Sequence, residues 1–327
     1  MMTIFNFLGS IFGYLLYAAF YVVQNFGVAI IIFTLVFKLI LFPSSLRQQR
    51  SMAQNSRMQA KQQELKEKYG NDKQKYNEEV QKLYDKEGVS PFSGCLTSFF
   101  PMFVMLGIYY SVVRPLTNVL HIADSAVNTI MEVANRFPGI SINSTGIYSQ
   151  IDVLRLFHNP DTLALITARN EITGAVSTAD IMKISNLSDG FNFLGLDLLS
   201  TPRTEGFFSW AMLIPVLCLV TSVGSQIFTM RTSGSAMNNQ QGCMKYMLLA
   251  LPLLTAYIAY TVPCAVGFYW VCSTVMGFIQ TVFMNKFYSP AQVLAKGEAA
   301  HVALLEQKEA LVPYDYQPVS DTKKKKS

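Results

Sequence analysis

Residues Gly27–Leu46 read GVAIIIFTLVFKLILFPSSL and decide the fold, because this run is apolar enough to cross a lipid bilayer. Twenty helical residues are about 30 Å long, one hydrocarbon thickness. Lys38 interrupts the run about 12 Å before its C-terminal end, beyond the reach of a lysine side chain of about 6 Å. Since an ammonium group in lipid is costly, Lys38 must face water, a partner or a cavity. Thr34 lies four residues earlier on the same helical face, so the sequence predicts a polar pocket at membrane depth.

The composition favours a protein with several membrane spans. Of the 327 residues, 51% are hydrophobic and 14% are charged, whereas soluble domains carry about 25% charged residues. The five cysteines lack metal-ligand spacing, and the three histidines lie far apart. We find no strong phosphate-binding loop or hydrolase nucleophile motif, so we expect no cofactor, no metal site and no enzyme active site.

The segment before this run, residues 1–25, contains no charged side chain. It lacks the basic start of a secretory signal, so we expect no cleavage. Ile4–Val23 is apolar enough to span, but only three residues separate it from the next helix. We therefore favour an outer interfacial helix with Tyr14, Tyr17 and Tyr21 as its interfacial aromatics, and keep a sixth span as the alternative.

The segment after it is strongly charged and helical by propensity. Residues 47–89 hold ten Lys or Arg and seven Asp or Glu, and Gly70 followed by Asn71 or Asp72 marks a break between two helices. The sequence thus predicts a helical hairpin. It is either a solvated spacer or a docking arm for a client, a ribosome or lipid headgroups.

Positive charge sets the expected topology. Arg47, Arg50 and Arg57 follow the first span and no positive charge precedes it, which places the N-terminus outside and the C-terminus in the cytoplasm. The expected segments are an outer interfacial helix (1–25), a first span (26–46), a cytoplasmic helical hairpin (47–91), a second span (92–115), an extracytoplasmic loop with an insertion (116–205), a third span (206–230), a cytoplasmic loop (231–243), a fourth span (244–261), a fifth span (262–284) and a basic cytoplasmic tail (285–327).

Two of these spans carry polar residues along one face. In the third span, Ser222, Ser225, Gln226 and Thr229 recur at helical spacing. In the fifth span the corresponding row is Trp270, Ser273 or Thr274, Gly277 and Thr281. Taken alone, the third span is explained more simply by ordinary hydrogen bonds between helices. Together with Lys38, the two faces predict a wet enclosure.

These pieces resemble the YidC/Oxa/Alb membrane-protein insertases, in the short form found in Gram-positive bacteria. The resemblance covers residues 24–118 and 190–287. Five fragments carry it in the family's order: GVAIIIFTLVFKLILFP, QKLYDKEGVSPFSGCL, FNFLGLDLLSTP, CMKYMLLALPLL and VGFYWVCSTVMGFIQTVFMNK. Each fragment alone is weakly specific, whereas all five in order are strongly specific.

The resemblance implies a protein that inserts client membrane proteins and helps them fold, in the bacterial plasma membrane and without covalent chemistry. The family fold is a core of five transmembrane helices around a hydrophilic groove, open to cytosol and lipid and closed outside. The family's groove charge falls on Lys38 and its groove hydroxyl on Thr34, and its client-contacting aromatics fall on Tyr269 and Trp270. Clients and membrane lipids are the implied partners. The Sec translocon, and a ribosome bound through the lysine-rich tail without nucleic-acid sequence specificity, are further candidates.

Three departures from the family pattern matter. The family usually has arginine where Lys38 stands, and lysine keeps the charge but loses the planar, multiply donating fork. Thr97 and Pro101 also depart from the pattern of the second span, so no groove residue is transferred to that helix. Residues 120–188 exceed the short loop usual in the family, and the resemblance offers no function for them.

The rival function is a small-molecule or ion transporter that uses Lys38 as an intramembrane anion or proton site. Such folds often contain internal repeats, and we find no convincing repeat in this sequence. An intramembrane enzyme would need a paired nucleophile or a metal cluster inside the spans, and the sequence shows neither. A purely structural scaffold would leave Lys38 unexplained.

Overall fold

The computed structural model describes residues 2–70, 72–87, 106–107, 109–232 and 243–288, with isolated residues between 292 and 307. The described residues are almost entirely helical. Several of their helices are long and apolar enough to cross a membrane, which confirms the expected all-α polytopic class.

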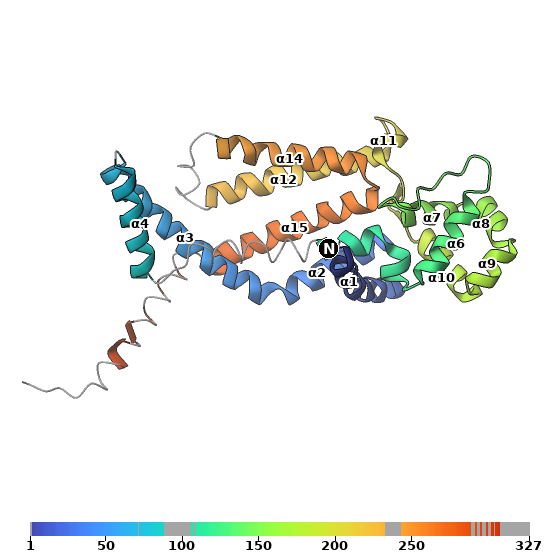
Figure 1. Ribbon diagram of the computed structural model, residues 1–327, viewed down its shortest axis with the longest axis horizontal. Helices are drawn as coiled ribbons and strands as arrows, with labels where there is room; N and C mark the ends of the chain where they lie inside the picture. The colour runs from blue at the N-terminus through green and yellow to red at the C-terminus, as the bar shows by residue number, and fades with distance from the viewer. Residues whose placement is uncertain are drawn as a thin grey trace, which may run out of the picture.

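Four long helices run along the longest dimension of the molecule (Figure 1). They are α2 (Phe26–Ile40), α12 (Leu213–Thr232), α14 (Cys243–Thr261) and α15 (Cys264–Phe287). Helix α12 packs between α14 and α15, and α15 also packs against α2. Together these helices form the bundle that positions the predicted site residues.

Length and hydropathy identify three segments in the described residues that can each span a membrane. A helix pair bent by more than 40° gives a fourth if it is counted as one span, and one further apolar helix is shorter. The three are Asn6–Val23, Trp210–Arg231 and Cys264–Phe287, the bent pair is Phe26–Ile40 with Phe42–Gln49, and the shorter helix is Ala250–Thr261. Most of the predicted second span, 92–115, lies outside the described residues.

The predicted first span is not one helix. Within the predicted first span, 26–46, α2 ends at Ile40, and α3 (Phe42–Tyr69) leaves it at an angle of 55°. Pro43 explains the break, because it has no amide hydrogen to donate to the carbonyl of Leu39 and its ring clashes with that carbonyl. The lysine therefore stands in the last turn of α2.

The charged segment after the first span forms two packed helices. Helix α3 packs against α4 (Lys73–Glu87), and Gln62 Nε2 donates to the hydroxyl of Tyr84 at 2.8 Å. Asp72 caps α4, since its Oδ1 accepts from the amide of Lys75 at 3.1 Å. Gly70 ends α3 with φ of −59°, so the expected glycine stop does not use a left-handed conformation.

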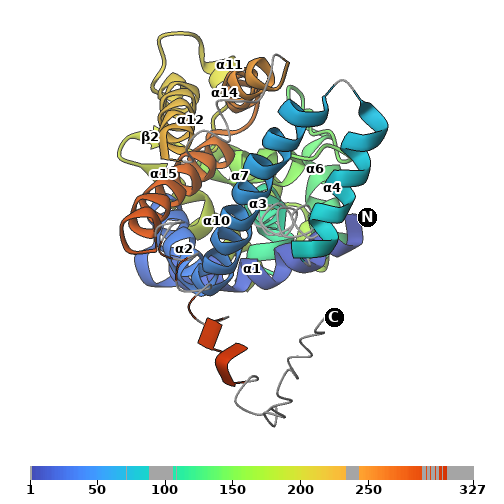
Figure 2. The same ribbon diagram turned by 90° about the vertical axis from the view of Figure 1, so that its left-hand side faces the viewer.

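The first helix, α1 (Met2–Val23), runs across the direction of α2 and α15 (Figures 1 and 2). It packs against α2 and against η1 (Pro115–Val119). A Cβ at Gly13 would lie 1.8 Å from the carbonyl oxygen of Asn118, so the close approach requires glycine. This crosswise direction suits an interfacial helix, although the composition of α1 also satisfies a span.

Residues 120–188, which the sequence left without a structural assignment, fold mainly into helices at the end of the bundle away from the hairpin (Figure 1). We call this end the distal end. Side chains cap two of the helices: Asn159 accepts from Asp161 N, and Ser177 accepts from Asp180 N. The helices are α6 (Asp124–Ala134), α7 (Ser149–His158), α8 (Pro160–Thr167), α9 (Asn170–Ala175) and α10 (Thr178–Asp189).

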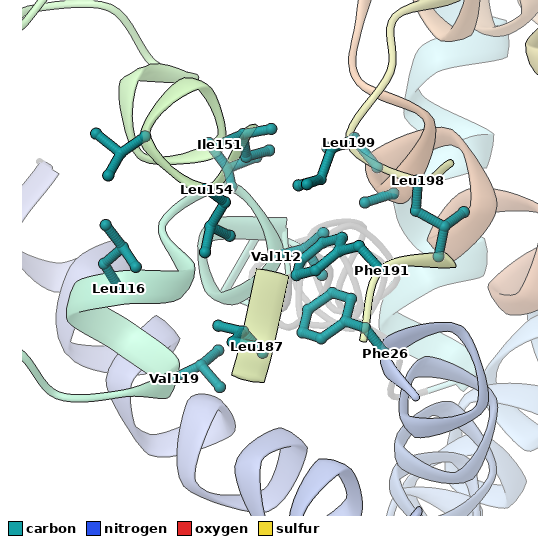
Figure 3. Close-up of a cluster of buried hydrophobic side chains, with 14 of the residues drawn as sticks. Phe26, Val112, Leu116, Val119, Ile151, Leu154, Leu187, Phe191, Leu198 and Leu199 are labelled. Atoms are coloured by element: carbon teal, nitrogen blue, oxygen red, sulfur yellow. The ribbon is translucent and has the colours of Figure 1, made fainter. Parts of the chain in front are cut away.

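A continuous apolar core joins these helices to the bundle. Figure 3 shows Leu154 of α7 and Leu187 of α10 grouped with Phe26 at the start of α2. The ring of Phe26 stacks on that of Phe191, with centroids 4.0 Å apart and planes at 18°. A two-stranded hairpin follows, with β1 (Asn192–Phe193) antiparallel to β2 (Leu196–Asp197). The insertion is therefore built onto the distal end rather than attached through a free linker.

Candidate functional site

Lys38 reaches from α2 to α15. Its side chain is half-buried, and a Cβ built on Gly277 would lie 3.4 Å from Lys38 Nζ. The lack of a side chain at Gly277 thus leaves room for the ammonium group at the surface of α15. No carboxylate among the described residues pairs with Lys38, so within this part of the chain the charge is held between two helices without a counter-ion.

Thr34 occupies a different environment from the one the sequence predicted. It lies one turn before Lys38, but it is only 3% exposed, and its hydroxyl donates to the carbonyl of Ile30 at 2.6 Å. A hydroxyl bonded to its own helix is already satisfied. Thr34 therefore packs in the interior, and only Lys38 of this pair has a half-exposed side chain.

Helix α15 places three predicted site residues near one another. Tyr269 is 2% exposed and hydrogen-bonds Ser273, one turn further along the helix. Trp270 and Ser273 are half-buried. Ser273 lies four residues before Gly277, so Tyr269, Ser273 and Gly277 form one row that leads toward the ammonium of Lys38.

The polar face of α12 lies along a separate hollow. Ser222 and Gln226 are half-buried, while Ser225 lines a cavity of about 360 Å³ between α12 and α15. Lys38 is not among the residues that line this cavity. Its full lining is Thr221, Gly224, Ser225, Ile227, Phe228, Arg231, Val275 and Phe278. Within the described residues, the predicted site residues therefore lie on two sides of α15.

Two further residues join the candidate site. Gln280 lies seven residues after Ser273 on α15, and its Nε2 is buried with no hydrogen-bond partner among the described residues. A buried amide without a partner is destabilising unless a ligand completes it. Arg231 lines the end of the α12–α15 cavity. Helical spacing from Ser273 would have revealed Gln280, whereas no pattern in the sequence marked Arg231 as a site residue.

The described residues contain no cluster of His, Cys, Asp or Glu able to hold a metal ion. Cys218 and Cys264 are buried and Cys272 is half-buried, all with free thiols, and Cys218 directs its thiol to the carbonyl of Gly267 at 3.5 Å. These cysteines pack between helices. The polar chemistry of the site is therefore one lysine, one arginine and several neutral hydrogen-bonding groups.

Comparison of the sequence with known proteins places the chain in a family. The pattern of the 60Kd inner membrane protein family matches residues 18–291. A membrane protein insertase YidC of Rickettsia massiliae is 25% identical over 265 residues, which are 81% of this chain and 36% of that protein. Proteins of the same name from Fusobacterium nucleatum and a Caulobacter species are 36% and 34% identical over 126 residues, 38% of this chain and 60% and 19% of theirs. Each match covers less than two thirds of the relative.

Proposed function

We propose, since this chain belongs to the 60Kd inner membrane protein family, that it inserts client membrane proteins into the bacterial inner membrane. The family assignment confirms the resemblance to the YidC/Oxa/Alb insertases. The chain is a multi-pass membrane protein of this family. The observation that carries the proposal is the ammonium group of Lys38, held between α2 and α15 without a carboxylate partner in the described residues.

An unpaired charge at this position can lower the cost of moving an acidic client segment into the membrane. Two opposite charges about 4 Å apart attract by about 4 kcal/mol at an effective dielectric constant near 20, against about 1 kcal/mol in water. Each polar group of the client loses water on entry, so part of this attraction offsets desolvation. Lys38 therefore favours clients whose leading segment carries Asp or Glu.

Neutral groups of α15 complete the proposed binding site. Ser273 and the amide of Gln280, which has no partner among the described residues, lie on the same helix as Gly277, where an added Cβ would lie 3.4 Å from Lys38 Nζ. They supply hydrogen bonds to a client backbone that has left water but has not yet formed a helix. Tyr269 and Trp270 would contact apolar client side chains. The client helix then moves sideways into lipid, driven by transfer of its apolar surface, and no covalent step is needed.

The direction of insertion follows from the proposed topology, with the N-terminus outside and the hairpin and tail in the cytoplasm. Clients then enter from the hairpin end, and the distal end is closed by the core around Phe26 and Phe191. Lipid headgroups, the Sec translocon and a ribosome remain proposed partners. The lysine-rich tail that suggested ribosome binding lies outside the described residues.

Charge substitutions at one position test this function. Insertion would be measured in vesicles with two clients that differ only in whether the translocated segment carries an acidic or a neutral residue. Loss of about 1.4 kcal/mol of net attraction is a tenfold effect, so K38Q should insert the acidic client about tenfold more slowly, while K38R should retain insertion. The neutral client should be little affected by either change.

A matched control removes one lysine elsewhere. Lys183 of α10 is paired with Asp180 at 2.9 Å on the distal end, so K183Q changes the net charge equally without touching the proposed site. If K38Q inserts the acidic client at the wild-type rate, the proposed role of the charge is wrong. If K183Q slows that client as much as K38Q, the effect is one of net charge and not of the site.

A further inference from the structure

Two short turns at the distal end present large apolar side chains to the surroundings. Leu194, at the tip of the β1–β2 hairpin, is 91% exposed. In the turn between α11 (Pro202–Glu205) and η2 (Trp210–Met212), Phe208 is fully exposed and Trp210 is 77% exposed. Figure 2 shows β2 and α11 on either side of α12 at the periphery of the molecule. Leu194 and Phe208 have the highest exposed fractions of all large apolar side chains in the described residues.

The hairpin tip contradicts local backbone preference. Leu194 has φ of 52° and Gly195 has φ of 80°, the left-handed pair of a two-residue hairpin turn. Asparagine or aspartate followed by glycine is strongly preferred in such turns, because leucine in the left-handed region is strained. Residues held in sparsely populated conformations point to a function of the side chain. Here the strained residue is also an almost fully exposed leucine.

The second tip is held by its own hydrogen bonds. Gly206 has φ of 90°, and its carbonyl accepts from the amide of Ser209 at 3.3 Å and from its hydroxyl at 2.9 Å. The rings of Phe207 and Phe208 pack edge to face with centroids 5.6 Å apart. The exposed aromatics are thus presented by a closed turn.

The residues beside each tip show where it lies relative to the ends of the membrane-spanning helices. Phe193, next to Leu194, packs on the first turn of α2, where a Cβ at Gly27 would lie 2.5 Å from its ring. It also contacts Phe268 near the start of α15, with ring centroids 5.0 Å apart. Trp210 is the first residue of the apolar segment Trp210–Arg231. Both tips therefore lie level with the ends of membrane-spanning helices.

We propose that the hairpin tip at Leu194 and the aromatic turn Phe207–Trp210 insert into the boundary between headgroups and acyl chains of the distal leaflet. Tryptophan favours this zone because its ring is apolar and its N–H can bond to water or headgroups. Two tips on either side of α12 would fix the depth and tilt of this helix beside the proposed client path. The occupant is lipid, because both tips lie level with the ends of the spans and point away from the protein.

Tryptophan fluorescence in vesicles of brominated phosphatidylcholine tests the proposal, since the chain has only two tryptophans. Bromines would be placed either high or low on the acyl chains. Wild-type protein should be quenched more strongly by the shallow bromines, and W210F should lose most of that shallow quenching while Trp270 remains. In the W210F background, L194W should restore it.

The control places the same probe on the insertion, away from the spans. Leu165 of α8 is 53% exposed, and L165W in the W210F background should show no added quenching at either depth. Equal shallow quenching of wild type and W210F, or stronger quenching by the deep bromines, would overturn the proposal. The comparison of wild type with W210F tests the proposal even if L194W fails to fold.

A second variant separates the fold from the lipid contact. L194N places a residue that tolerates the left-handed region in the same turn. It should raise the melting temperature of the purified protein in detergent relative to wild type. A lower melting temperature would show that Leu194 serves the protein's own packing, which would contradict its assignment as a lipid contact.

Discussion

The stacked pair Phe26–Phe191 offers a quantitative test of whether the segment that follows the insertion packs on the bundle. Both rings are 0% exposed, and their centroids lie 4.0 Å apart. Truncation of a buried phenylalanine to alanine costs about 3–5 kcal/mol, so F26A and F191A should each destabilise by that amount. Contact between the rings adds a coupling of about 0.5–1.5 kcal/mol. The double variant should therefore cost less than the sum of the two single variants by at least that coupling.

The assay is reversible unfolding in mixed detergent micelles, followed by circular dichroism for the wild type, the two single variants and the double variant. L165A serves as a control, because Leu165 is more than half exposed and should change the free energy of unfolding by less than about 0.5 kcal/mol. Additivity within about 0.3–0.5 kcal/mol would mean that the rings do not interact. The segment that follows the insertion would then not be held to the first span through this ring pair.

Two other contacts at the distal end give sharp expectations. G13A should lower the melting temperature in detergent, because the added Cβ would lie 1.8 Å from the Asn118 carbonyl oxygen. The control G174A, whose added Cβ meets nothing within 4 Å, should be neutral or slightly stabilising. Equal effects of the two substitutions would contradict the packing of α1 on η1. Burial lowers the pKa of His121, whose ring stacks on Tyr14 with centroids 3.7 Å apart, so the folded state favours the neutral ring. Its contribution to stability should be complete above the unfolded pKa of about 6.5 and should be lost as the pH falls below that value toward the lower folded pKa. Melting temperatures recorded between about pH 7.5 and 5 should therefore fall less steeply for H121Q than for wild type, and identical slopes would contradict this assignment.

The sequence predicted the elements whose signals are local. Periodicity and capping predicted apolar third and fifth spans (206–230 and 262–284) and a charged hairpin with a cap at Asn71 or Asp72. The structure has helices over 213–232 and 264–287 and a cap at Asp72. The helical fold of the insertion was not predicted, although Asn159 and Ser177 are recognisable helix caps. Its core joins α7 and α10 to Phe26, far earlier in the chain, and no local pattern reports such a contact.

The candidate site likewise has features that the sequence predicted and features that depend on how the helices pack. Helical spacing placed Trp270, Ser273 or Thr274, Gly277 and Thr281 on one row, and the family resemblance added Tyr269. Neither could show that Gly277 leaves room for Lys38, because that depends on how α2 packs on α15. Spacing also grouped Thr34 with Lys38. Burial against the core and a hydrogen bond to Ile30 then removed the threonine from the exposed face. Assignment of roles to these residues stays a prediction until client contacts are measured.

The bend after α2 changes the depth that the sequence implied for the lysine. In a straight helix, Lys38 lies about 12 Å before Leu46, and the side chain covers about 6 Å of that distance. With a bend of 55° at Leu41, the same eight residues rise only about 9 Å along the axis of α2. The ammonium group is then about 3 Å short of the end of the apolar run instead of about 6 Å. A narrow entry of water suffices to hydrate it, yet it is still deeper than any lysine of the hairpin. Under the proposed function, the break caused by Pro43 would keep one cation both tolerated in the membrane and available to a client carboxylate.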